Sequence, residues 1–294
     1  MAYKSGYGAV IGRANAGKST LINVLVGEKV AIVSPKPQTT RDRILGVLTT
    51  EEYQAVFIDT PGLYKADNLL NGVMQKSAED SAGEADLVLF VVDAHEGLGE
   101  RDIELVKKYT KLSVPTVVVL SKTDIMPESL LISEMKELSN YGAEIVPVSA
   151  RRGKNLKELK KVIYDKLPEA EKIFSEDIIS DRSEKFMVSE IMREKILLKF
   201  EREIPHGVAI IVNVFKINEN GVYDINLDII CEKQNHKAIL IGKQGSAIKE
   251  ISSFARKDME KFLGRKVFLT TYVKVKEDWR NSARLIKEHG YSEF

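Results

Sequence analysis

Up to about residue 168, short runs of nearly continuous apolar residues alternate with stretches in which apolar residues recur every three or four positions. The first pattern is typical of strands covered by helices on both faces, and the second is typical of amphipathic helices. The sequence therefore predicts an α/β domain over residues 1–170, with a mostly parallel sheet and helices on both faces. The predicted strands are YGAVIG (7–12), YQAVFIDT (53–60), DLVLFVVDA (86–94), PTVVVLSK (115–122) and AEIVPVSA (143–150).

The pattern changes after a polar stretch without a sustained period, residues 171–182, which we interpret as a linker. Residues 183–294 then predict a smaller α+β domain with the order α-β-β-α-α-β. Its predicted elements are a helix over 183–203, strands over 207–217 and 222–232 joined by the turn NENG, a short helix to 241, the loop GKQG (242–245), a helix over 246–264, a strand over 266–276 and a last helix around Trp279 and Ile286.

Cysteine content and hydropathy favour a cytoplasmic protein. The only cysteine, Cys231, lies on the apolar side of an alternating strand, so we expect a buried thiol and no intramolecular disulfide. The longest apolar runs are far shorter than the roughly 20 residues of a membrane span. The first residues, MAYKSGYGAV, lack the basic segment and apolar core of a secretory signal.

Charge is distributed unevenly along the chain although the net charge is only +1. Residues 182–294 contain 21 Lys and Arg against 16 Asp and Glu, and residues 237–287 contain 13 against 5. A basic C-terminal half favours a polyanionic partner, with solvated helix faces as the alternative explanation.

The segment GRANAGKST follows the first predicted strand and opens a helix. Its spacing, Gly12 to Gly17, Lys18 and Ser19, is that of a P-loop, whose backbone N–H groups bind phosphate oxygens. We expect Lys18 to bridge the terminal phosphates and Ser19 to ligate Mg²⁺. The predicted nucleotide-binding residues here are Gly12, Arg13, Ala14, Asn15, Ala16, Gly17, Lys18, Ser19 and Thr20.

A second motif, DTPG, ends the strand over 53–60. A carboxylate at this end of a parallel strand lies where ligands bind, so Asp59 is predicted to hold the metal through water. Gly62 is predicted to sense the γ-phosphate through its N–H, and Thr60, Pro61 and Leu63 complete this part of the site. Residues 35–43, PKPQTTRDR, predict a switch segment that brings a threonine to Mg²⁺, Thr40 as first choice and Thr39 as second.

The motif SKTD, residues 121–124, ends the strand over 115–122 and indicates which nucleotide base the protein binds. An ionised carboxylate only accepts hydrogen bonds, so Asp124 suits the N1–H and amino group of guanine and not the N1 acceptor of adenine. The backbone N–H of Ala150 is predicted to bind the guanine carbonyl oxygen. The predicted residues at this end are Ser121, Lys122, Thr123, Asp124, Ser149, Ala150 and Arg151.

The order of these motifs resembles a translation-factor-class GTPase, and the second domain resembles a type II KH fold with IGKQG as its Gly-x-x-Gly loop. Together, and with the ending WRNSARLIKEHGY, the chain resembles the Era family of bacterial ribosome-assembly GTPases over nearly its whole length. The resemblance implies hydrolysis of GTP to GDP and phosphate, binding of small-subunit ribosomal RNA near its 3′ end, and assistance to 30S assembly. Similar GTPases also hold K⁺ beside the P-loop, which adds Asn15 to the predicted catalytic residues Lys18, Thr40, Asp59 and Gly62.

The GKQG glycines leave room for close approach to RNA phosphates, Lys243 adds charge, and Ile241 offers apolar surface to a base. The predicted RNA-binding residues are Ile241, Gly242, Lys243, Gln244 and Gly245.

Two positions depart from known patterns. Ser121 stands where the family usually has Asn, and a hydroxyl replaces only part of that amide's hydrogen bonding. Leu63 stands where Ras-like enzymes have the Gln that orients water, so we expect slow intrinsic hydrolysis.

Two alternative functions remain open on the sequence alone: an RNA-binding module with a weakened nucleotide domain, and a membrane-surface GTPase in peripheral contact with anionic lipid at the inner face of the cell membrane. We expect a monomer. The four histidines, at positions 95, 206, 236 and 289, show no metal-ligand spacing.

Overall fold

The structure, a computed structural model, describes residues 2–62, 68–288 and 291 of the chain. Contacts group these residues into two compact units, each with a sheet and a hydrophobic core of its own. The first unit comprises 2–33, 40–62 and 74–181, and the second comprises 34–39, 68–73, 182–288 and 291.

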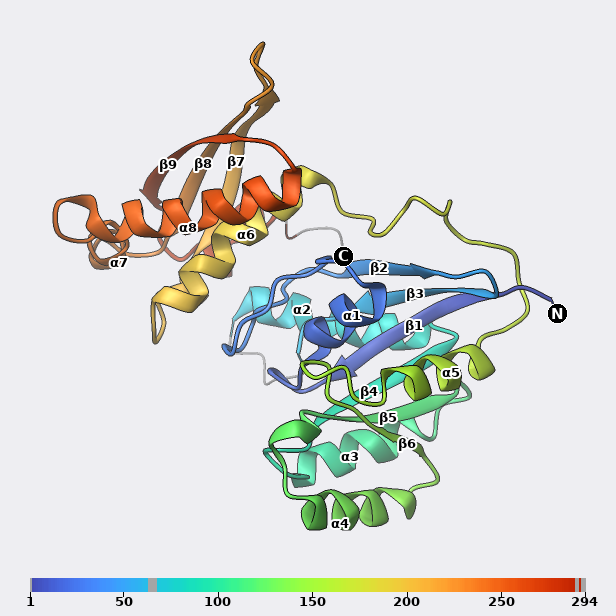
Figure 1. The fold of residues 1–294 in the computed structure, drawn as a ribbon. Helices are drawn as coiled ribbons and strands as arrows, with labels where there is room; N and C mark the ends of the chain where they lie inside the picture. Colours follow the sequence, from blue (N-terminus) through green and yellow to red (C-terminus); the bar gives the residue numbers. More distant parts are fainter. Residues whose placement is uncertain (1, 63–67, 289–290, 292–294) are drawn as a thin grey trace. The chain divides into compact units, whose positions relative to one another are not determined.

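The first unit contains a six-stranded sheet in the order β2-β3-β1-β4-β5-β6 (Figure 1). All neighbours are parallel except β2 and β3, which form an antiparallel pair. The predicted α/β architecture is therefore confirmed. Its strands are β1 (Lys4–Gly12), β2 (Ile44–Thr49), β3 (Tyr53–Asp59), β4 (Leu87–Asp93), β5 (Thr116–Ser121) and β6 (Glu144–Pro147).

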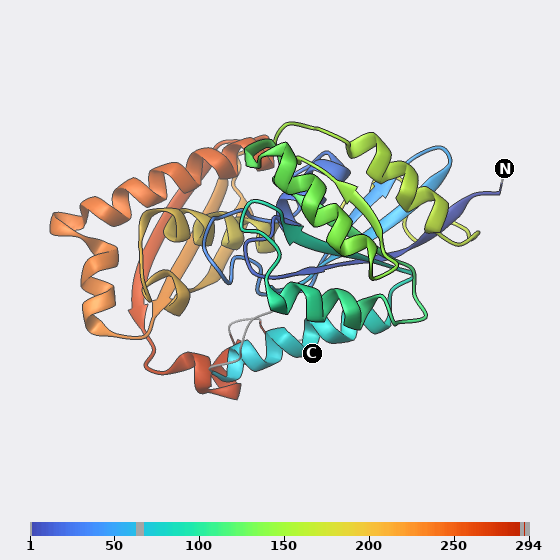
Figure 2. The ribbon, with the colours of Figure 1, turned by 90° about the horizontal axis from the view of Figure 1, so that it is seen from below.

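Helices cover both faces of this sheet, because alternate strand side chains point to opposite sides. Helices α1 and α5 pack in one core with Val10 and Val91, whereas α2, α3 and α4 pack in the other with Ile11 and Phe90. In Figure 2, α2 and α3 are seen on one side of the sheet and α5 on the other. The helices are α1 (Lys18–Val26), α2 (Leu69–Gly83), α3 (Glu100–Tyr109), α4 (Glu128–Ser139) and α5 (Leu156–Lys166), with a 3₁₀ turn η1 at Thr123–Ile125.

Residues 171–181, predicted as part of a linker, group with the first unit and lie against the edge of its sheet. Ser180 forms an antiparallel bridge with Gly46 of β2, and the Val47 N–H donates to the Ile179 carbonyl at 2.9 Å. The buried side chain of Gln54 accepts from the N–H of Phe174 and donates to its carbonyl, each at 2.9 Å. We call residues 173–181 the edge segment, because these bonds close the free edge of β2.

The second unit has the predicted order α-β-β-α-α-β around a three-stranded sheet, β7-β8-β9, in which β8 pairs antiparallel to β7 and parallel to β9. Its central strand supplies alternate buried residues to the core beneath the helices, including Cys231, whose thiol pKa is raised by burial. The elements are α6 (Glu184–Lys199), η2 (Pro205–Gly207), β7 (Ala209–Ile217), β8 (Tyr223–Cys231), α7 (Gln234–Ile241), η3 (Lys243–Gly245), α8 (Ser246–Leu263), β9 (Val267–Val275), η4 (Trp279–Asn281) and α9 (Ala283–Glu288). The last predicted helix is therefore divided into a 3₁₀ turn and a short α-helix.

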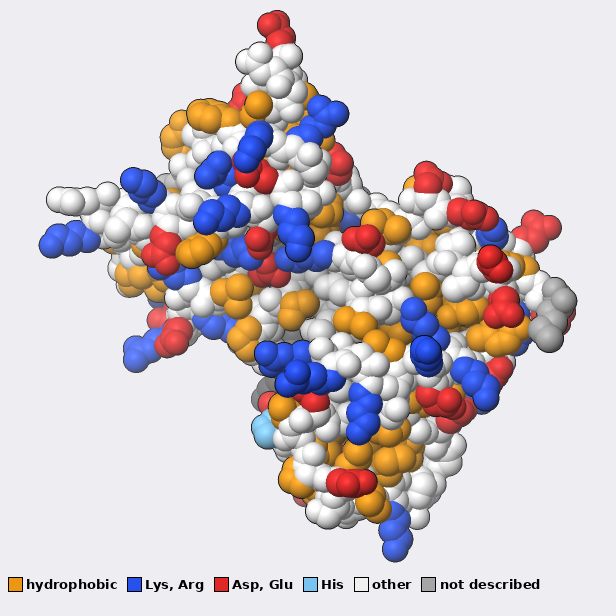
Figure 3. Space-filling view, in the orientation of Figure 1, with side chains coloured by type: hydrophobic (Ala, Val, Ile, Leu, Met, Phe, Trp, Pro, Cys, Tyr) orange, Lys and Arg blue, Asp and Glu red, His pale blue; other side chains and the backbone are white. Residues whose placement is uncertain are grey.

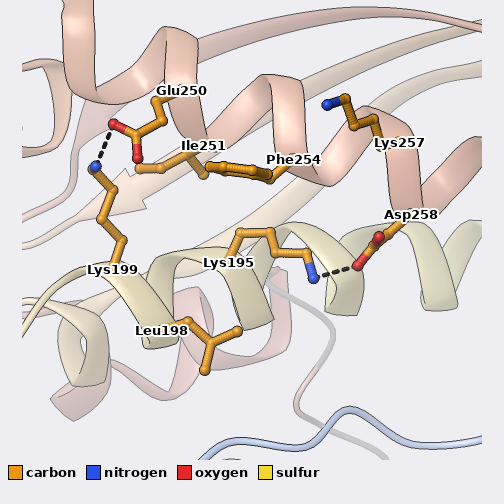
Figure 4. A pocket seen from close by; sticks show the side chains of 8 residues that line it. All are labelled: Lys195, Leu198, Lys199, Glu250, Ile251, Phe254, Lys257 and Asp258. Carbon is orange, nitrogen blue, oxygen red and sulfur yellow. Dashed lines mark hydrogen bonds and ion pairs between the residues drawn. The ribbon is translucent and has the colours of Figure 1, made fainter.

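Helices α6 and α8 pack side by side, and two ion pairs join them (Figure 4). Lys195 binds Asp258, and Lys199 binds Glu250 at 2.6 Å. The surface groove between the helices is also lined by Leu198 and Phe254, both about half exposed. Lys195 and Lys199 are thus neutralised by their partners. Over the described ranges, no helix is long and apolar enough to cross a membrane.

Candidate nucleotide site and RNA-binding loop

The P-loop connects β1 to α1 through a backbone that needs glycine. Gly17 has φ 93° and Asn15 φ 63°, and a Cβ on Gly12 would collide with the carbonyl oxygen of Val91. No side chain among the described residues caps the start of α1, so its first N–H groups remain available to an anion. The predicted segment thus forms a glycine-dependent turn at a helix N-terminus, the geometry that a phosphate-binding loop requires.

Lys18 is buried, and its ammonium donates to the carbonyls of Gly12 at 3.1 Å and Arg13 at 3.0 Å. Burial lowers the pKa of Lys18 to about 8, and the nearby charge of Asp59 offsets part of that shift. A nucleotide phosphate would replace these neutral partners with a charged one, which stabilises the cation more strongly.

Three side-chain oxygens predicted as metal ligands meet in the structure. Ser19 Oγ donates to Asp59 Oδ2 at 2.7 Å and lies 2.8 Å from Thr40 Oγ1, which donates to the same carboxylate oxygen at 3.1 Å. They come from α1, from the chain before β2 and from the end of β3, so the fold brings together residues 40 positions apart.

This cluster suits Mg²⁺, which prefers oxygen ligands and binds through one or two carboxylates together with phosphates. Asp59 is fully buried, and its Oδ1 has no hydrogen-bond partner among the described residues. Burial raises the Asp59 pKa, while Lys18 and the hydroxyls of Ser19 and Thr40 lower it. A bound divalent cation would satisfy the unpaired oxygen and favour the ionised carboxylate.

The two candidate threonines of the switch segment point to different places. Thr40 faces Ser19 and Asp59, whereas the Thr39 hydroxyl donates to the carbonyl of Lys36 at 2.6 Å within its own loop. The geometry therefore favours Thr40, the first choice.

The DTPG motif approaches the P-loop closely. A Cβ on Gly62 would lie 2.7 Å from Ala14 Cα, so only glycine fits here, and Thr60 Oγ1 donates to the carbonyl of Val10 at 2.8 Å. Pro61 is buried beside them. The predicted residue Leu63 lies outside the described residues.

Ser121 links the base-recognition motif to the P-loop. Its buried hydroxyl lies 2.6 Å from the carbonyl oxygen of Ala16 and 3.0 Å from that of Val92. A hydroxyl has one hydrogen, so it can donate to only one of these acceptors at a time. Lys122, with φ 57°, turns the chain and pairs with Asp93.

Asp124 is exposed and accepts a hydrogen bond from the buried hydroxyl of Ser149 at 2.6 Å. This bond, with smaller contributions that include the charges of Arg152 and Arg151, lowers the Asp124 pKa. The carboxylate is therefore ionised and open to a ligand, as guanine recognition requires. The Thr123 N–H donates to the Val148 carbonyl at 3.3 Å, which joins SKTD to the VSA segment containing Ala150.

In the second unit, GKQG turns the chain between α7 and α8. Gly242 (φ 74°) has no room for a Cβ, which would lie 2.7 Å from Ala247 Cβ, and Gly245 (φ 77°) begins α8. Lys243 and Gln244 are exposed and Ile241 is half-buried. Figure 3 shows Lys and Arg side chains gathered over this unit on the side of α6 and α8. The loop thus combines open backbone with the exposed side chains of Lys243 and Gln244.

One residue that sequence reasoning missed is Arg193 on α6. Its guanidinium donates to the carbonyls of Gln38 and Thr39, the two residues that precede Thr40. In the sequence, Arg193 follows Glu190 by three residues on a predicted helix, a spacing that suggests only a surface ion pair. The sequence therefore contained no signal for the contact with residues 38 and 39.

Comparison with known families supports both halves of the fold. Residues 8–122 match the family described as 50S ribosome-binding GTPase, and residues 203–280 match the KH domain. The fold and site therefore define a P-loop GTPase that carries a C-terminal KH domain.

Full-length relatives are more specific. The chain is 45% identical over 290 residues to GTPase Era of Clostridium kluyveri, covering 98% of this chain and 99% of that protein. It matches the crystal structure of an Aquifex aeolicus Era point variant bound to GDP·AlF4⁻ with TM-score 0.94 and 41% identity, over 98% of this chain and 99% of that one. A structure of Era in complex with MgGDPNP and nucleotides 1506–1542 of 16S ribosomal RNA gives the same TM-score, identity and coverage. The chain belongs to the Era GTPase family, and it is a GTP-hydrolysing enzyme.

Proposed function

We propose that this protein is a GTP-driven switch that binds small-subunit ribosomal RNA near its 3′ end and assists assembly of the 30S subunit. Ribosomal RNA is a cytoplasmic partner, so the proposal also locates the protein in the cytoplasm. The GKQG loop carries the proposal: two positive-φ glycines bring bare backbone to the surface, with exposed Lys243 and Gln244 between them. The relative solved with a 16S fragment, at 41% identity, supports the choice of RNA.

In the nucleotide site, Lys18 would bind the terminal phosphates, and Asp124 would select guanine. Ser19, Thr40 and Asp59 would hold Mg²⁺, which supplies charge neutralisation at the β- and γ-phosphates when bound. Thr40 belongs to a segment separate from the P-loop, so its position can depend on whether a γ-phosphate is present. This dependence is the proposed switch.

The backbone at Asn15 turns through a left-handed conformation beside the phosphate-binding glycines. We propose that its side-chain oxygen contributes to a K⁺ site that stabilises charge during hydrolysis. Hydrolysis rates in KCl and in NaCl at equal ionic strength test this, with Asn15→Ala expected to remove the difference.

The RNA assignment is tested by replacing Lys243 and Gln244 with Asp. Two carboxylates would then face the phosphate backbone, so binding of a small-subunit 3′-end RNA fragment should be lost while GTP binding is retained. The measurement is a titration of labelled RNA at fixed salt with GTP and Mg²⁺ present.

A matched control is Lys216→Asp with Asn220→Asp, which makes the same change in net charge at exposed positions around the turn between β7 and β8. This control leaves the GKQG loop unchanged and alters only the overall charge seen by a polyanion, so it should weaken binding only slightly. Equal loss in both variants would contradict a specific role for the loop.

The same reagents separate the alternatives. Failure of the parent protein to bind fluorescent GDP would favour an RNA-binding module with a weakened nucleotide domain. Flotation with anionic liposomes that RNA does not compete away would favour a membrane-surface GTPase. We propose that the protein acts as a monomer, which light scattering with and without GTP tests.

A further inference from the structure

Helix α6 contains an arginine whose charge is completely enclosed. The Arg193 side chain has no exposed surface and pairs with the nearly buried Glu190 one turn earlier. Its Nε donates to Glu190 Oε1 at 2.7 Å, and its Nη2 donates to Oε2. A buried guanidinium is stable only when its N–H groups have hydrogen-bond acceptors. The N–H groups that do not bind Glu190 therefore identify further partners of Arg193.

Those donors bind the backbone of the switch segment. Nη1 donates to the Gln38 carbonyl at 3.3 Å, and Nη2 donates to the Thr39 carbonyl. All of these residues belong to the second unit. The two carbonyls are the last before Thr40, whose hydroxyl lies against Ser19 and Asp59.

The chain around these carbonyls is braced for this contact. Gln38 adopts a left-handed conformation with φ 60°, and the Thr39 hydroxyl donates back to the Lys36 carbonyl at 2.6 Å. The segment therefore presents consecutive carbonyls to one planar donor group. A lysine at this position could keep the positive charge opposite Glu190. It could not donate to both carbonyls and the carboxylate with a planar group, because its ammonium is a compact donor on a flexible chain.

We propose that Arg193 is a positioning residue for the GTPase reaction: it fixes the backbone at Gln38 and Thr39, so that Thr40 reaches the metal cluster. The inference rests on the metal role of Thr40 in the proposed function. Arg193 does not touch the nucleotide. It acts through the peptide bond between Thr39 and Thr40.

This role predicts a selective effect on nucleotide binding. Thr40 is needed only when a γ-phosphate and Mg²⁺ are present, so loss of Arg193 should weaken a non-hydrolysable GTP analogue and spare GDP. We expect Arg193→Lys to raise the Kd of the analogue with Mg²⁺ by about tenfold, the lower end of the net worth of one hydrogen bond from a charged donor. The Kd of GDP should stay within about twofold of the parent, because no contact of the diphosphate state depends on Thr40.

The chain offers a matched control on the same helix. Lys195, two residues further on, binds Glu194 and Asp258 and has no bond to residues 34–39 within the described structure (Figure 4). Lys195→Gln therefore disturbs α6 without touching the switch segment. Because neither of its ion pairs involves residues 34–39, it should leave the Kd of both nucleotides within about twofold.

A double-mutant cycle with Thr40→Ala separates positioning from a general structural role. If Arg193 acts through Thr40, Arg193→Lys should cause no further loss of analogue binding in the Thr40→Ala background. Additive losses, or equal losses for GDP and the analogue, would overturn the proposal. If Thr40→Ala itself changes nothing, the metal role of Thr40 fails and the route proposed for Arg193 fails with it. If Thr40→Ala weakens analogue binding and Arg193→Lys does not, the Arg193 inference alone is refuted.

Thermal unfolding identifies variants that do not fold. If Arg193→Lys is unfolded, the double variant Glu190→Gln with Arg193→Gln removes both buried charges together and leaves neither unpaired. It should show the same selective loss of analogue binding, and unchanged analogue binding in this variant would equally refute the proposal.

Discussion

The P-loop and the switch segment, residues 35–43, both belong to the predicted nucleotide site, but they are held in different ways. The P-loop is fixed by bonds within the first unit, from Lys18 to two loop carbonyls and from Ser121 to the Ala16 carbonyl. In the switch segment, the Thr39 hydroxyl donates to the Lys36 carbonyl, and the guanidinium of Arg193 on α6 donates to the carbonyls of Gln38 and Thr39. The P-loop is thus held by residues around it in the first unit, whereas the segment that leads to Thr40 is held by its own Thr39 and by Arg193 of α6.

The two kinds of attachment predict different effects on nucleotide binding. The P-loop is fixed within its own unit and can bind the phosphates that GDP and GTP share. Thr40 belongs to a separate segment, so its contribution can depend on the γ-phosphate and the metal. Changes in the P-loop should therefore affect both nucleotides, and changes at Thr40 only the triphosphate.

The largest effect is expected from Lys18→Ala, which should weaken GDP and GTP alike. Loss of charge-assisted bonds to the phosphates predicts a decrease of about 1,000-fold in affinity. Titration with fluorescent nucleotide measures it. Thermal unfolding of the nucleotide-free variant is the control and should show a cooperative transition, which identifies a folded protein. Near-normal affinity in a folded variant would contradict the P-loop assignment.

Thr40→Ala should weaken a GTP analogue in the presence of Mg²⁺ by about tenfold and leave GDP binding unchanged, because one metal ligand of the triphosphate state is lost. Thr39→Ala is the comparison: its hydroxyl braces its own loop and does not face the metal cluster, so its effect on analogue binding should be smaller than that of Thr40→Ala. If Thr39→Ala caused the selective loss and Thr40→Ala did not, the threonines would have to be exchanged.

The pH dependence of stability provides a third measurement on Lys18. Its pKa is about 8 in the folded protein against 10.5 in the unfolded chain. Between these values the unfolded chain retains a proton that the folded protein has lost, so the free energy of unfolding should rise with pH by up to about 1.4 kcal/mol per pH unit. Chemical unfolding of nucleotide-free protein at pH 8 to 10, compared with Lys18→Met, isolates this contribution. A slope equal in both proteins would show that Lys18 titrates normally.

The smallest expected effect is a gain. Ser121→Asn should tighten GDP binding by about 1 kcal/mol, roughly fivefold, because an amide can donate to the Ala16 and Val92 carbonyls together where one hydroxyl hydrogen cannot. Ser121→Ala is the control and should weaken binding. Weaker binding by the Asn variant would mean that the buried pocket is shaped around serine.

Local pattern was sufficient to predict most of the fold. The runs over 53–60 and 86–94 are apolar because both faces of the sheet are covered, and β3 and β4 lie within them. It was not sufficient for β2, Ile44–Thr49, which follows the polar switch segment and pairs antiparallel at the edge of the sheet. Its short run ILGVLT contains a glycine and resembles the continuation of a loop.

The site divides in the same way. Gly12, Lys18 and Asp124 belong to motifs whose spacing encodes their chemistry, so they could be predicted from the chain alone. The choice between Thr39 and Thr40 needed geometry, because adjacent hydroxyls in a loop are equivalent in sequence. The role of Arg193 could be found only from the structure. Its partners are backbone carbonyls about 155 residues away, and backbone acceptors leave no residue-specific signal in the sequence.

The edge segment has a consequence for how the N-terminal half can be isolated. A fragment ending at residue 170 would keep every residue predicted to contact the nucleotide. It would also remove Ile179 and Ser180 from β2 and leave the buried Gln54 without the backbone of Phe174. Unpaired strand edges are templates for association between molecules, so such a fragment should form oligomers or precipitate. A fragment extended to residue 181 would keep the edge of β2 covered. The eleven residues 171–181, which form no helix or strand, should therefore decide whether the isolated N-terminal fragment is monomeric or aggregates.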